Sequence, residues 1–380
     1  MNFGLTNDQK MLQKEVRNFA ETELKPLASE IDVSGEFPSE NIKKLAEMGL
    51  MGIIVPEKYS GSEFDFISLA IAIEEISRVC ASTGVIVAVN NSLVSYPILQ
   101  FGNEEQKQKY LPPLCIGEKI GAMGITEPNA GSDVAAMEAT AKLNGDHYIL
   151  NGTKRFITNG TAADTFVVFA YTDKDAGYKG MSCFIVERDL EGFSLGKHED
   201  LMGIRATGNC ELIFEDVKVP KENLLGKEGD GFKICMNTLD VSRIDIGAQG
   251  VGIAQAALDE SIKYSKERKT FGKPICHHEM IQNMLAEMAT KIQAARLLVY
   301  YVGYLKDKGV KRFSKESAMA KYYAADIAVD VTRKAVQIHG GYGYTKDYPV
   351  ERFYRDARIL ELYEGTSEIQ KIVIARDLVK

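Results

Sequence analysis

Apolar residues follow three successive patterns along this chain of 380 residues. From Leu5 to about Leu114 they recur at helical spacing, as Met11, Leu12, Val16 and Phe19 do near the start. Residues that disfavour helix interrupt this first pattern at four positions, Pro26, Pro38, Pro56 and Gly61. The first third of the chain is therefore predicted to form several helices.

The pattern changes between about Gly121 and Val219. Short runs rich in β-branched and aromatic residues, which favour strands, occupy 165–171, 181–187 and 210–219. The segment 147–160 contains Asn151-Gly152, a pair that accepts positive φ, and it predicts a hairpin around that pair. A β-domain is expected here.

Helical spacing returns from Gly231 onward, for example at Leu285, Met288, Ile292 and Ala295. The chain has no internal repeat or low-complexity tract, so the order is α, then β, then α. We expect an α+β multidomain fold with an N-terminal α-helical domain at 1–118, a middle β-domain at 119–225 and a C-terminal α-helical domain at 226–380.

Composition limits the classes of function. With 45% hydrophobic residues the chain can bury a large core, and a net charge of -7 without basic runs argues against nucleic acid as a partner. The six cysteines are scattered and form no Cys-x-x-Cys pair, which fits a reducing compartment. Neighbouring His277 and His278 cannot share a helix face as metal ligands would, so no metal site is predicted.

The N-terminal segment resembles no targeting sequence. It contains acidic residues and lacks both the apolar core of a signal peptide and the Arg-rich, acid-free character of a transit peptide. No stretch reaches the roughly 20 apolar residues expected of a membrane span. We therefore expect a cytoplasmic protein without membrane association.

The segment 363–370, YEGTSEIQ, is the strongest candidate for chemistry. Glu364 precedes Gly365, which leaves room for a substrate, and the following residues predict a helix start with free backbone N–H groups. Such a carboxylate is suited to act as a base. The alternative is structural, because Ser367 and Gln370 also fit a helix capping box.

Two glycine-rich segments are suited to binding a nucleotide-like cofactor. The segment 121–133 offers small residues and the hydroxyls of Thr126 and Ser132, and the segment 337–352 carries three glycines after a predicted helix. Neither contains a Walker A motif or a Gly-x-Gly-x-x-Gly turn. These segments alone identify no cofactor.

Taken together, five segments in this order resemble the acyl-CoA dehydrogenase family over essentially the whole chain. They are GITEPNAGSD at 124–133, NGTKRFITNG at 151–160, ERKTFGKP at 267–274, QIHGGYGYTKDYPVERFYRD at 337–356 and YEGTSEIQ at 363–370. The similarity is greatest to the short-chain and bacterial butyryl-CoA enzymes. The resemblance implies a C-terminal domain like a four-helix bundle.

The resemblance implies flavin chemistry on a short-chain acyl-CoA. Glu364 would take the α-proton while the β-hydrogen leaves as hydride to N5 of FAD, which gives a trans-2-enoyl-CoA. Electrons would pass to an electron-transferring flavoprotein. The Glu364 backbone N–H would help to bind the thioester oxygen, and an apolar pocket should raise the pKa of the Glu364 carboxyl.

The resemblance also assigns binding residues one by one. For FAD they are Met123, Ile125, Thr126, Gly131, Ser132, Phe156, Ile157, Thr158, Thr366, Ser367 and Glu368. From a neighbouring subunit they are Arg268, Phe271, Glu279, Gln337, Ile338, Gly340 and Gly341, so a homo-oligomer, a tetramer built as a dimer of dimers, is expected. For the acyl-CoA they are Ser132, Asp240, Arg243, Tyr363 and Gly365. Val94, Tyr96 and Ile98 would form the floor of the acyl tunnel.

Some residues of this chain differ from those usual in the family, and one distinguishes the branches of the family. Ser242 stands where the isovaleryl and long-chain branches carry their base, and it cannot act as one. Glu279 replaces a usual Gln near the neighbouring FAD, and Phe156 replaces a frequent Trp. Two alternatives remain, an enoyl-CoA reductase that runs the same chemistry backwards with an electron-transferring flavoprotein, and a non-catalytic acyl-CoA or flavin-binding scaffold.

Overall fold

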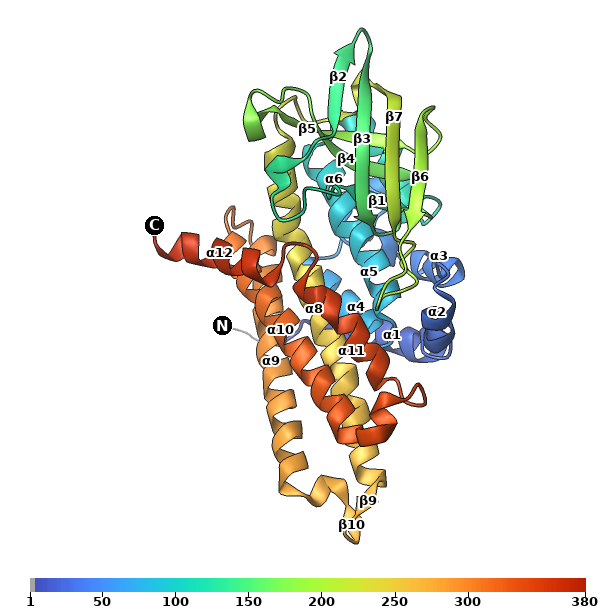
Figure 1. The fold of residues 1–380 in the computed structure, drawn as a ribbon, viewed down its shortest axis with the longest axis vertical. Helices are drawn as coiled ribbons and strands as arrows, with labels where there is room; N and C mark the ends of the chain where they lie inside the picture. The colour runs from blue at the N-terminus through green and yellow to red at the C-terminus, as the bar shows by residue number, and fades with distance from the viewer. Residues whose placement is uncertain (1–3) are drawn as a thin grey trace.

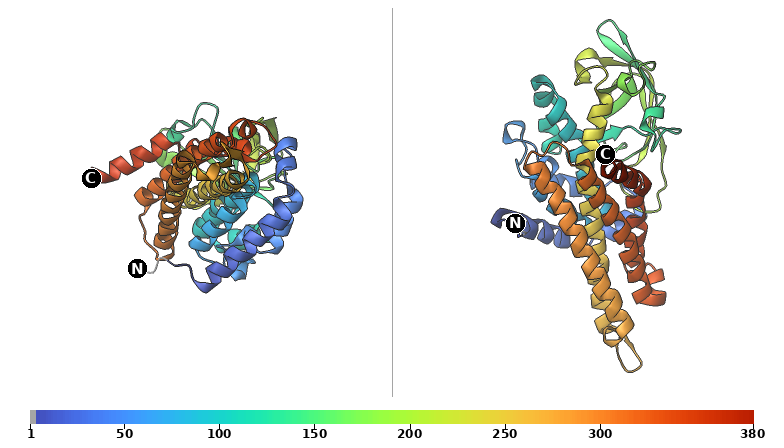
Figure 2. Two further views of the ribbon diagram at one scale, coloured as in Figure 1. Left: turned by 90° about the horizontal axis from the view of Figure 1, so that it is seen from below. Right: turned by 90° about the vertical axis from the view of Figure 1, so that its left-hand side faces the viewer.

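The computed structural model describes residues 4–380 and arranges them in three parts along one long axis (Figure 1). The β-domain lies at one end, the N-terminal helices lie beside the middle, and long C-terminal helices extend to the opposite end. The right-hand view of Figure 2 shows the same extension of the helices away from the β-domain, and the left-hand view looks along the long axis. The predicted α–β–α order is confirmed.

The N-terminal part is helical. Its α-helices are α1 Asn7–Phe19, α2 Ala28–Ser34, α3 Ser39–Glu47, α4 Phe66–Ser77, α5 Ala81–Ala88, α6 Tyr96–Phe101 and α7 Glu104–Cys115. Capping boxes start two of them, Thr6 with Gln9 on α1 and Asn103 with Gln106 on α7. A π-helical segment, Val89–Ser95, joins α5 to α6.

The strands of the middle part form an eight-stranded sheet. They are β1 Gly121–Gly124, β2 Thr140–Asn144, β3 His147–Ile157, β4 Thr165–Tyr171, β5 Met181–Glu187, β6 Phe193–His198, β7 Cys210–Pro220 and β8 Leu224–Leu225. The order is β6-β7-β3-β2-β4-β5-β8, and β1 pairs in parallel with β4.

Strand β4 is buried on both faces, and its residues alternate between two hydrophobic clusters. Val167 and Phe169 pack into the large cluster that the helices share, whereas Phe166 and Val168 pack into a cluster confined to the β-domain. The sheet is thereby fixed against the helices.

The predicted hairpin around Asn151-Gly152 is wrong, because β3 runs through this pair without turning. The ladder with β7 shifts register there, and Asn151 exchanges hydrogen bonds with Asp216 at 2.8 and 2.9 Å. Gly152 has φ of 141°, and a Cβ atom on it would approach Ala139 to 2.7 Å. The pair therefore marks a bulge, and the turn between β2 and β3 contains Gly145 instead.

The C-terminal part consists of helices, some of them long, that pack against one another (Figure 1). They are α8 Gly231–Glu267, α9 Glu279–Asp307, α10 Ser314–His339, α11 Val350–Arg358 and α12 Ser367–Leu378, and the short strands β9 Lys269–Thr270 and β10 Lys273–Pro274 join α8 to α9. Close approach of α8 to α4 requires Gly252, where a Cβ atom would lie 2.3 Å from the Glu74 carbonyl oxygen. The domain boundaries after residues 118 and 225 stay predictions.

One described helical stretch, Ala81–Phe101, is long and apolar enough to cross a membrane, contrary to the expectation that none would be. Within the fold, 83% of its apolar window is buried, as in the core helix of a folded domain. This stretch therefore gives only weak support for a membrane span.

Candidate functional site

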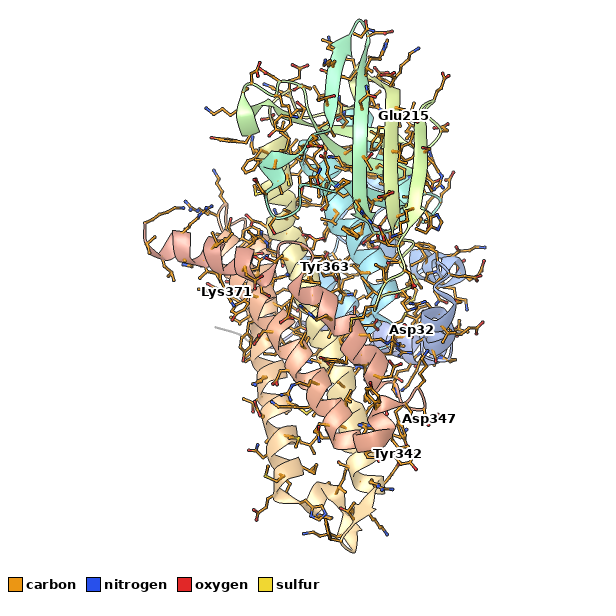
Figure 3. All side chains as sticks on the ribbon, in the orientation of Figure 1. Asp32, Glu215, Tyr342, Asp347, Tyr363 and Lys371 are labelled. Atoms are coloured by element: carbon orange, nitrogen blue, oxygen red, sulfur yellow. The ribbon has the colours of Figure 1, made fainter. Side chains whose placement is uncertain are left out.

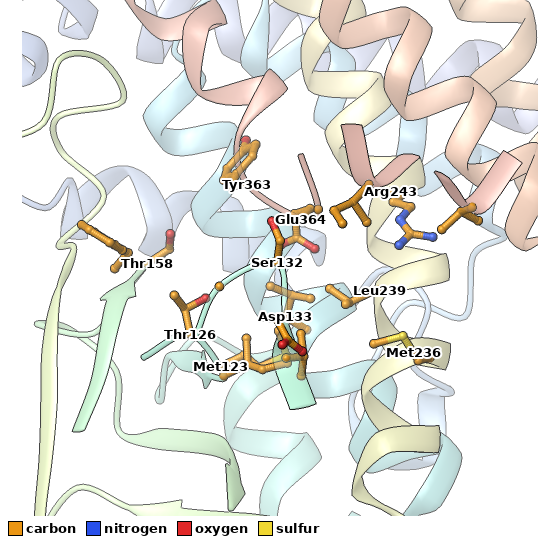
Figure 4. Close-up of a pocket in the computed structure, with 18 of the residues that line it drawn as sticks. Met123, Thr126, Ser132, Asp133, Thr158, Met236, Leu239, Arg243, Tyr363 and Glu364 are labelled. Atoms are coloured by element: carbon orange, nitrogen blue, oxygen red, sulfur yellow. The ribbon is translucent and has the colours of Figure 1, made fainter. Parts of the chain in front are cut away.

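A cavity of about 610 Å³ lies where the three parts of the chain meet (Figure 4). Its walls come from α5 and the π-helical segment, from the ends of β1 and β3, from the loop that follows β1, from α8, and from α12 and the turn before it. The lining is mostly apolar, with a few hydroxyl and charged groups among it. Such a cavity fits a bound organic ligand.

Glu364 lies on the wall of this cavity, on the turn between α11 and α12. Its φ is 55°, a left-handed conformation that a residue other than glycine rarely adopts, and the following Gly365 has φ of 89°. Burial raises the pKa of the Glu364 carboxyl. The hydrogen bond from Ser242 Oγ to Glu364 Oε2, at 2.5 Å, acts in the opposite direction on this pKa.

Side chains from two helices hold this turn by its carbonyl oxygens. Gln370 Nε2 donates to the carbonyl oxygens of Glu364 and Gly365, at 3.1 and 2.9 Å. Lys321 Nζ on α10 donates to the Gly365 carbonyl oxygen at 2.7 Å. The helix start predicted here is present, but its N-cap is Thr366, which accepts from Ile369 N, so the capping box of Ser367 and Gln370 is wrong.

The predicted acyl-CoA residues lie at or near the same cavity. Arg243 lines it and pairs with Asp240 at 2.8 Å, one turn earlier on α8. Asp240 is not on the wall and also accepts a hydrogen bond from Ser314. Ser132, Tyr363 and Gly365 are on the wall, and burial lowers the pKa of Arg243.

Eight predicted flavin residues meet in this cavity, although they come from two separate segments. They are Met123, Ile125, Thr126, Gly131, Ser132, Phe156, Ile157 and Thr158. In the view of Figure 4, Ser132 lies close to Glu364 near the middle of the site, and Thr126 and Thr158 lie farther to the left. The Phe156 side chain is 54% exposed, and a Cβ atom on Gly131 would touch nothing within 4 Å.

These features fit FAD, because a flat ring system needs an open apolar face with hydrogen-bonding groups at its edge. The half-exposed Phe156 ring offers the face, and hydroxyls of Thr126, Ser132 and Thr158 offer the edge groups. Three further FAD positions are not on the wall, since Thr366 caps α12, Ser367 is buried and Glu368 is exposed.

The remaining predicted FAD residues lie far from this cavity within one chain. A second cavity of about 700 Å³ includes Arg268, Ile338, Gly340 and Gly341 in its lining. Figure 3 shows Tyr342, which also lines it, toward the lower end of the molecule, whereas Tyr363 is central. A single chain therefore does not unite the two groups of predicted FAD residues.

The other three predicted residues of that group are exposed. Phe271 has 96% of its surface exposed, and Gln337 and Glu279 are also accessible. Among residues 4–380, Glu279 forms no ion pair with Arg268, Lys273, His277 or His278. Its carboxylate faces solvent in the single chain.

The acyl-tunnel floor differs from the prediction. Val85, Val89 and Leu93 line the cavity, whereas Val94 lies against Gly121 and Tyr96 donates a hydrogen bond to Asn237 at 2.9 Å. Ile98 is also buried away from the wall. Val85, Val89 and Leu93 follow one another at intervals of four residues, so they share one face of this helical stretch.

Sequence reasoning missed a buried ion pair next to the glycine-rich segment 121–133. Lys154 Nζ lies 2.7 Å from Glu127 Oε1, and both side chains are buried. The Glu127 carboxylate also accepts hydrogen bonds from the backbone N–H groups of Glu138 and Ala139. The pair thus fixes both ends of the loop that carries Ser132. Within the described part of the chain, no three His, Cys, Asp or Glu side chains gather as metal ligands.

Family models of the acyl-CoA dehydrogenases match nearly all of the chain. The N-terminal domain model matches residues 6–118, the middle domain model 122–217 and the C-terminal domain model 229–379. The short-chain specific acyl-CoA dehydrogenase of Clostridium acetobutylicum is 54% identical over 99% of each chain. The acryloyl-CoA reductase (NADH) of Anaerotignum propionicum is 52% identical over 100% of this chain and 96% of that one.

Solved structures agree with these relatives. A chain in the structure reported for the electron transferring flavoprotein of Acidaminococcus fermentans has a TM-score of 0.99 and 52% identity, with both chains covered completely. Butyryl-CoA dehydrogenase from Megasphaera elsdenii has a TM-score of 0.98 and 47% identity, again over the whole of both chains.

Proposed function

The chain belongs to the acyl-CoA dehydrogenase family and is an FAD-dependent oxidoreductase, and from this premise we propose that it converts short-chain acyl-CoA to trans-2-enoyl-CoA with Glu364 as the base. One observation carries the assignment. The Glu364 carboxylate faces a largely apolar cavity, and burial raises its pKa. A base near the operating pH transfers protons most efficiently, so this shift favours proton abstraction.

Glu364 would remove the α-proton, and the electrons of that C–H bond would form the new double bond. Bound FAD supplies the acceptor for the hydride that leaves the β-carbon. The apolar walls around Glu364 would keep water from the reacting carbons. Ser242 would hold the carboxylate toward the cavity through its hydrogen bond. Ser242 has no role as a base. A neutral hydroxyl is too weakly basic to take the α-proton, and a serine hydroxyl does not ionise near neutral pH.

The negative charge that develops on the thioester oxygen needs a hydrogen-bond donor. Among residues 4–380 the backbone N–H of Glu364 donates to no acceptor, and it belongs to a residue on the cavity wall. We assign this N–H group to the thioester oxygen. Glu364 would thus contribute both its carboxylate and its backbone to the reaction.

A short acyl chain is favoured by the walls and by the relatives. Val89 and Leu93 on one side and Met236 and Leu239 on α8 limit the cavity beside Glu364. The relatives named above include a short-chain specific enzyme and a butyryl-CoA enzyme. We propose acyl chains of about four to six carbons, because an extra methylene without space costs about 1–3 kcal/mol in repacking.

The proposal includes partners. An electron-transferring flavoprotein would accept the electrons, which the similarity to a chain from such a system supports. A homotetramer would bring the second cavity, with Arg268 and Gly341, to the FAD of a neighbouring subunit. Phe271 has 96% of its surface exposed in the single chain, so a neighbouring subunit is free to contact it.

A second candidate is reduction of an enoyl-CoA by the same residues in reverse. The similarity to an acryloyl-CoA reductase favours it. Glu364 would then return a proton to the α-carbon. Both directions use the same site, so the direction depends on whether the electron-transferring flavoprotein is oxidised or reduced and on the relative amounts of acyl-CoA and enoyl-CoA.

Flavin spectra recorded under anaerobic conditions test the proposal. The purified protein should be yellow, and butyryl-CoA should bleach it faster than octanoyl-CoA does. Crotonyl-CoA should reoxidise the reduced protein. The rate of flavin reduction by butyryl-CoA is then compared with the rate of reoxidation by crotonyl-CoA, both with an electron-transferring flavoprotein present, and the faster reaction indicates the direction. A colourless protein, or one that no saturated acyl-CoA from four to eight carbons bleaches, would contradict it.

A further inference from the structure

Lys321 is a buried charge that the reaction described above does not use. It lies on α10, its side chain is fully buried, and Nζ donates to the Gly365 carbonyl oxygen at 2.7 Å. Burial lowers the pKa of Lys321 to about 7. Burying an ammonium group is costly, so a lysine at this position calls for an explanation beyond packing.

The hydrogen bond from Lys321 is made to a turn with an unfavourable backbone conformation. Glu364 has φ of 55° and Gly365 has φ of 89°, so a relaxed turn would move the Glu364 side chain and its N–H group together. Gln370 Nε2 and Lys321 Nζ both donate to the Gly365 carbonyl oxygen, from α12 and α10. Two donors from different helices therefore oppose relaxation of this turn.

We propose that Lys321 is a positioning residue of the reaction, which together with Gln370 holds the Glu364–Gly365 turn so that the carboxylate and N–H of Glu364 face the substrate. The proposal rests on the assignment of Glu364 as the base. It assigns Lys321 a role in the reacting geometry but no contact with the acyl-CoA, since Lys321 is absent from the cavity wall.

Lys321 also acts on Glu364 through its charge. It lowers the pKa of the Glu364 carboxyl, against the larger effect of burial. Several other polar or ionisable groups interact with this carboxyl, all of them on α8 or next to it in sequence: Cys235, Ser242, Arg243, Asp245 and Tyr363. Charged groups that act on Lys321 itself are Arg243, Glu361, Glu364 and Glu368.

The test uses the FAD-containing protein and the variants Lys321→Met and Lys321→Arg. Methionine keeps much of the volume and removes both donor and charge, whereas arginine keeps both. The control is Lys334→Met on the same helix, where Nζ pairs with Asp330 and Glu287 away from the site. Single-turnover flavin reduction by butyryl-CoA, its dependence on pH, and the dissociation constant of butyryl-CoA are measured for each.

We expect Lys321→Met to slow reduction by about 10- to 100-fold, as small misplacements of reacting groups do, with the dissociation constant changed by less than about threefold. The acidic limb of its pH profile should move to higher pH, because the carboxylate loses a stabilising charge. Lys321→Arg should recover part of the rate. Lys334→Met should match the parent in rate and pH profile.

The proposal is overturned if Lys321→Met reduces its flavin at the rate and with the pH profile of the parent. It is also overturned if Lys321→Met and Lys334→Met lose the same fraction of the reduction rate. If Lys321→Met does not yield a folded flavoprotein, Gln370→Leu removes the other donor to the turn and must show the same loss of rate without loss of binding. These results are separable from failure of the proposed function, in which the parent is not bleached or Glu364→Gln is bleached normally.

Discussion

Ser242 Oγ donates a hydrogen bond of 2.5 Å to Oε2 of Glu364, and so joins α8 to the turn before α12 across the edge of the cavity. Two effects therefore oppose each other at this carboxyl. Burial favours the neutral form and raises its pKa, and the hydroxyl favours the ionised form. The balance decides at which pH the base is ready to accept a proton.

The first prediction is a pH profile that Ser242 controls. Because only ionised Glu364 accepts a proton, flavin reduction by butyryl-CoA should increase with pH through the raised pKa of Glu364. Ser242→Ala removes the donor, so the rising limb should move to higher pH. Ser261→Ala on the same helix, whose hydroxyl bonds only the Ala257 carbonyl oxygen, is the control. A limb that stays in place or moves to lower pH in Ser242→Ala would refute this account.

The second prediction concerns acyl length. Leu93→Ala enlarges the cavity, so the ratio of kcat/KM for octanoyl-CoA to that for butyryl-CoA should increase by about 10-fold, the low end of the effect of one methylene group. Val94→Ala, one residue on, should leave the ratio unchanged because Val94 lies against Gly121 and not on the wall. An octanoyl-CoA optimum in the parent would reject the short-chain proposal.

Local motifs predicted the parts of the site that depend on local sequence. The segment 363–370 predicted a carboxylate before a helix start, and the resemblance made Glu364 the candidate base. Thr126 and Thr158 line one cavity, as the resemblance implied. Lys321 carried no such signal, because its partner Gly365 lies 44 residues away and a lysine in a helix is usually solvated.

The errors also come from non-local contacts. Asn151-Gly152 has the composition of a turn, but its partner Asp216 and the close approach of Ala139 make it a bulge within β3. The resemblance implied Val94, Tyr96 and Ile98 as the tunnel floor, but these side chains are buried off the cavity wall, and Val85, Val89 and Leu93 line it instead.

The third prediction tests the buried ion pair of Lys154 and Glu127 at the loop that carries Ser132. Lys154→Met leaves the Glu127 carboxylate buried without its cation, which should reduce the stability by about 3–5 kcal/mol. The double variant Lys154→Met with Glu127→Gln should regain a large part of this loss. The measurement is the urea or thermal midpoint of each protein. Equal midpoints for the single variant and the parent would show that the pair does not stabilise the loop.

The fourth prediction concerns Glu279. If a neighbouring subunit places its FAD pyrophosphate about 6 Å from this exposed carboxylate, the like charges repel by roughly 2–3 kcal/mol at an effective dielectric of about 20. Glu279→Gln should then release FAD more slowly than the parent, most clearly at low salt. Release is followed by flavin fluorescence after dilution, with Glu105→Gln on α7 as the control. Equal release rates would show that Glu279 faces solvent in the assembly too.

The central claim is that Glu364 takes the α-proton, and anaerobic single-turnover reduction by butyryl-CoA tests it most directly. A positioned base contributes about 100- to 10,000-fold, so Glu364→Gln should slow flavin bleaching by at least about 100-fold while it keeps its FAD and its thermal midpoint. Glu361→Gln, three residues earlier and paired with Arg358, should react at the parent rate. Near-normal bleaching of Glu364→Gln would contradict the account.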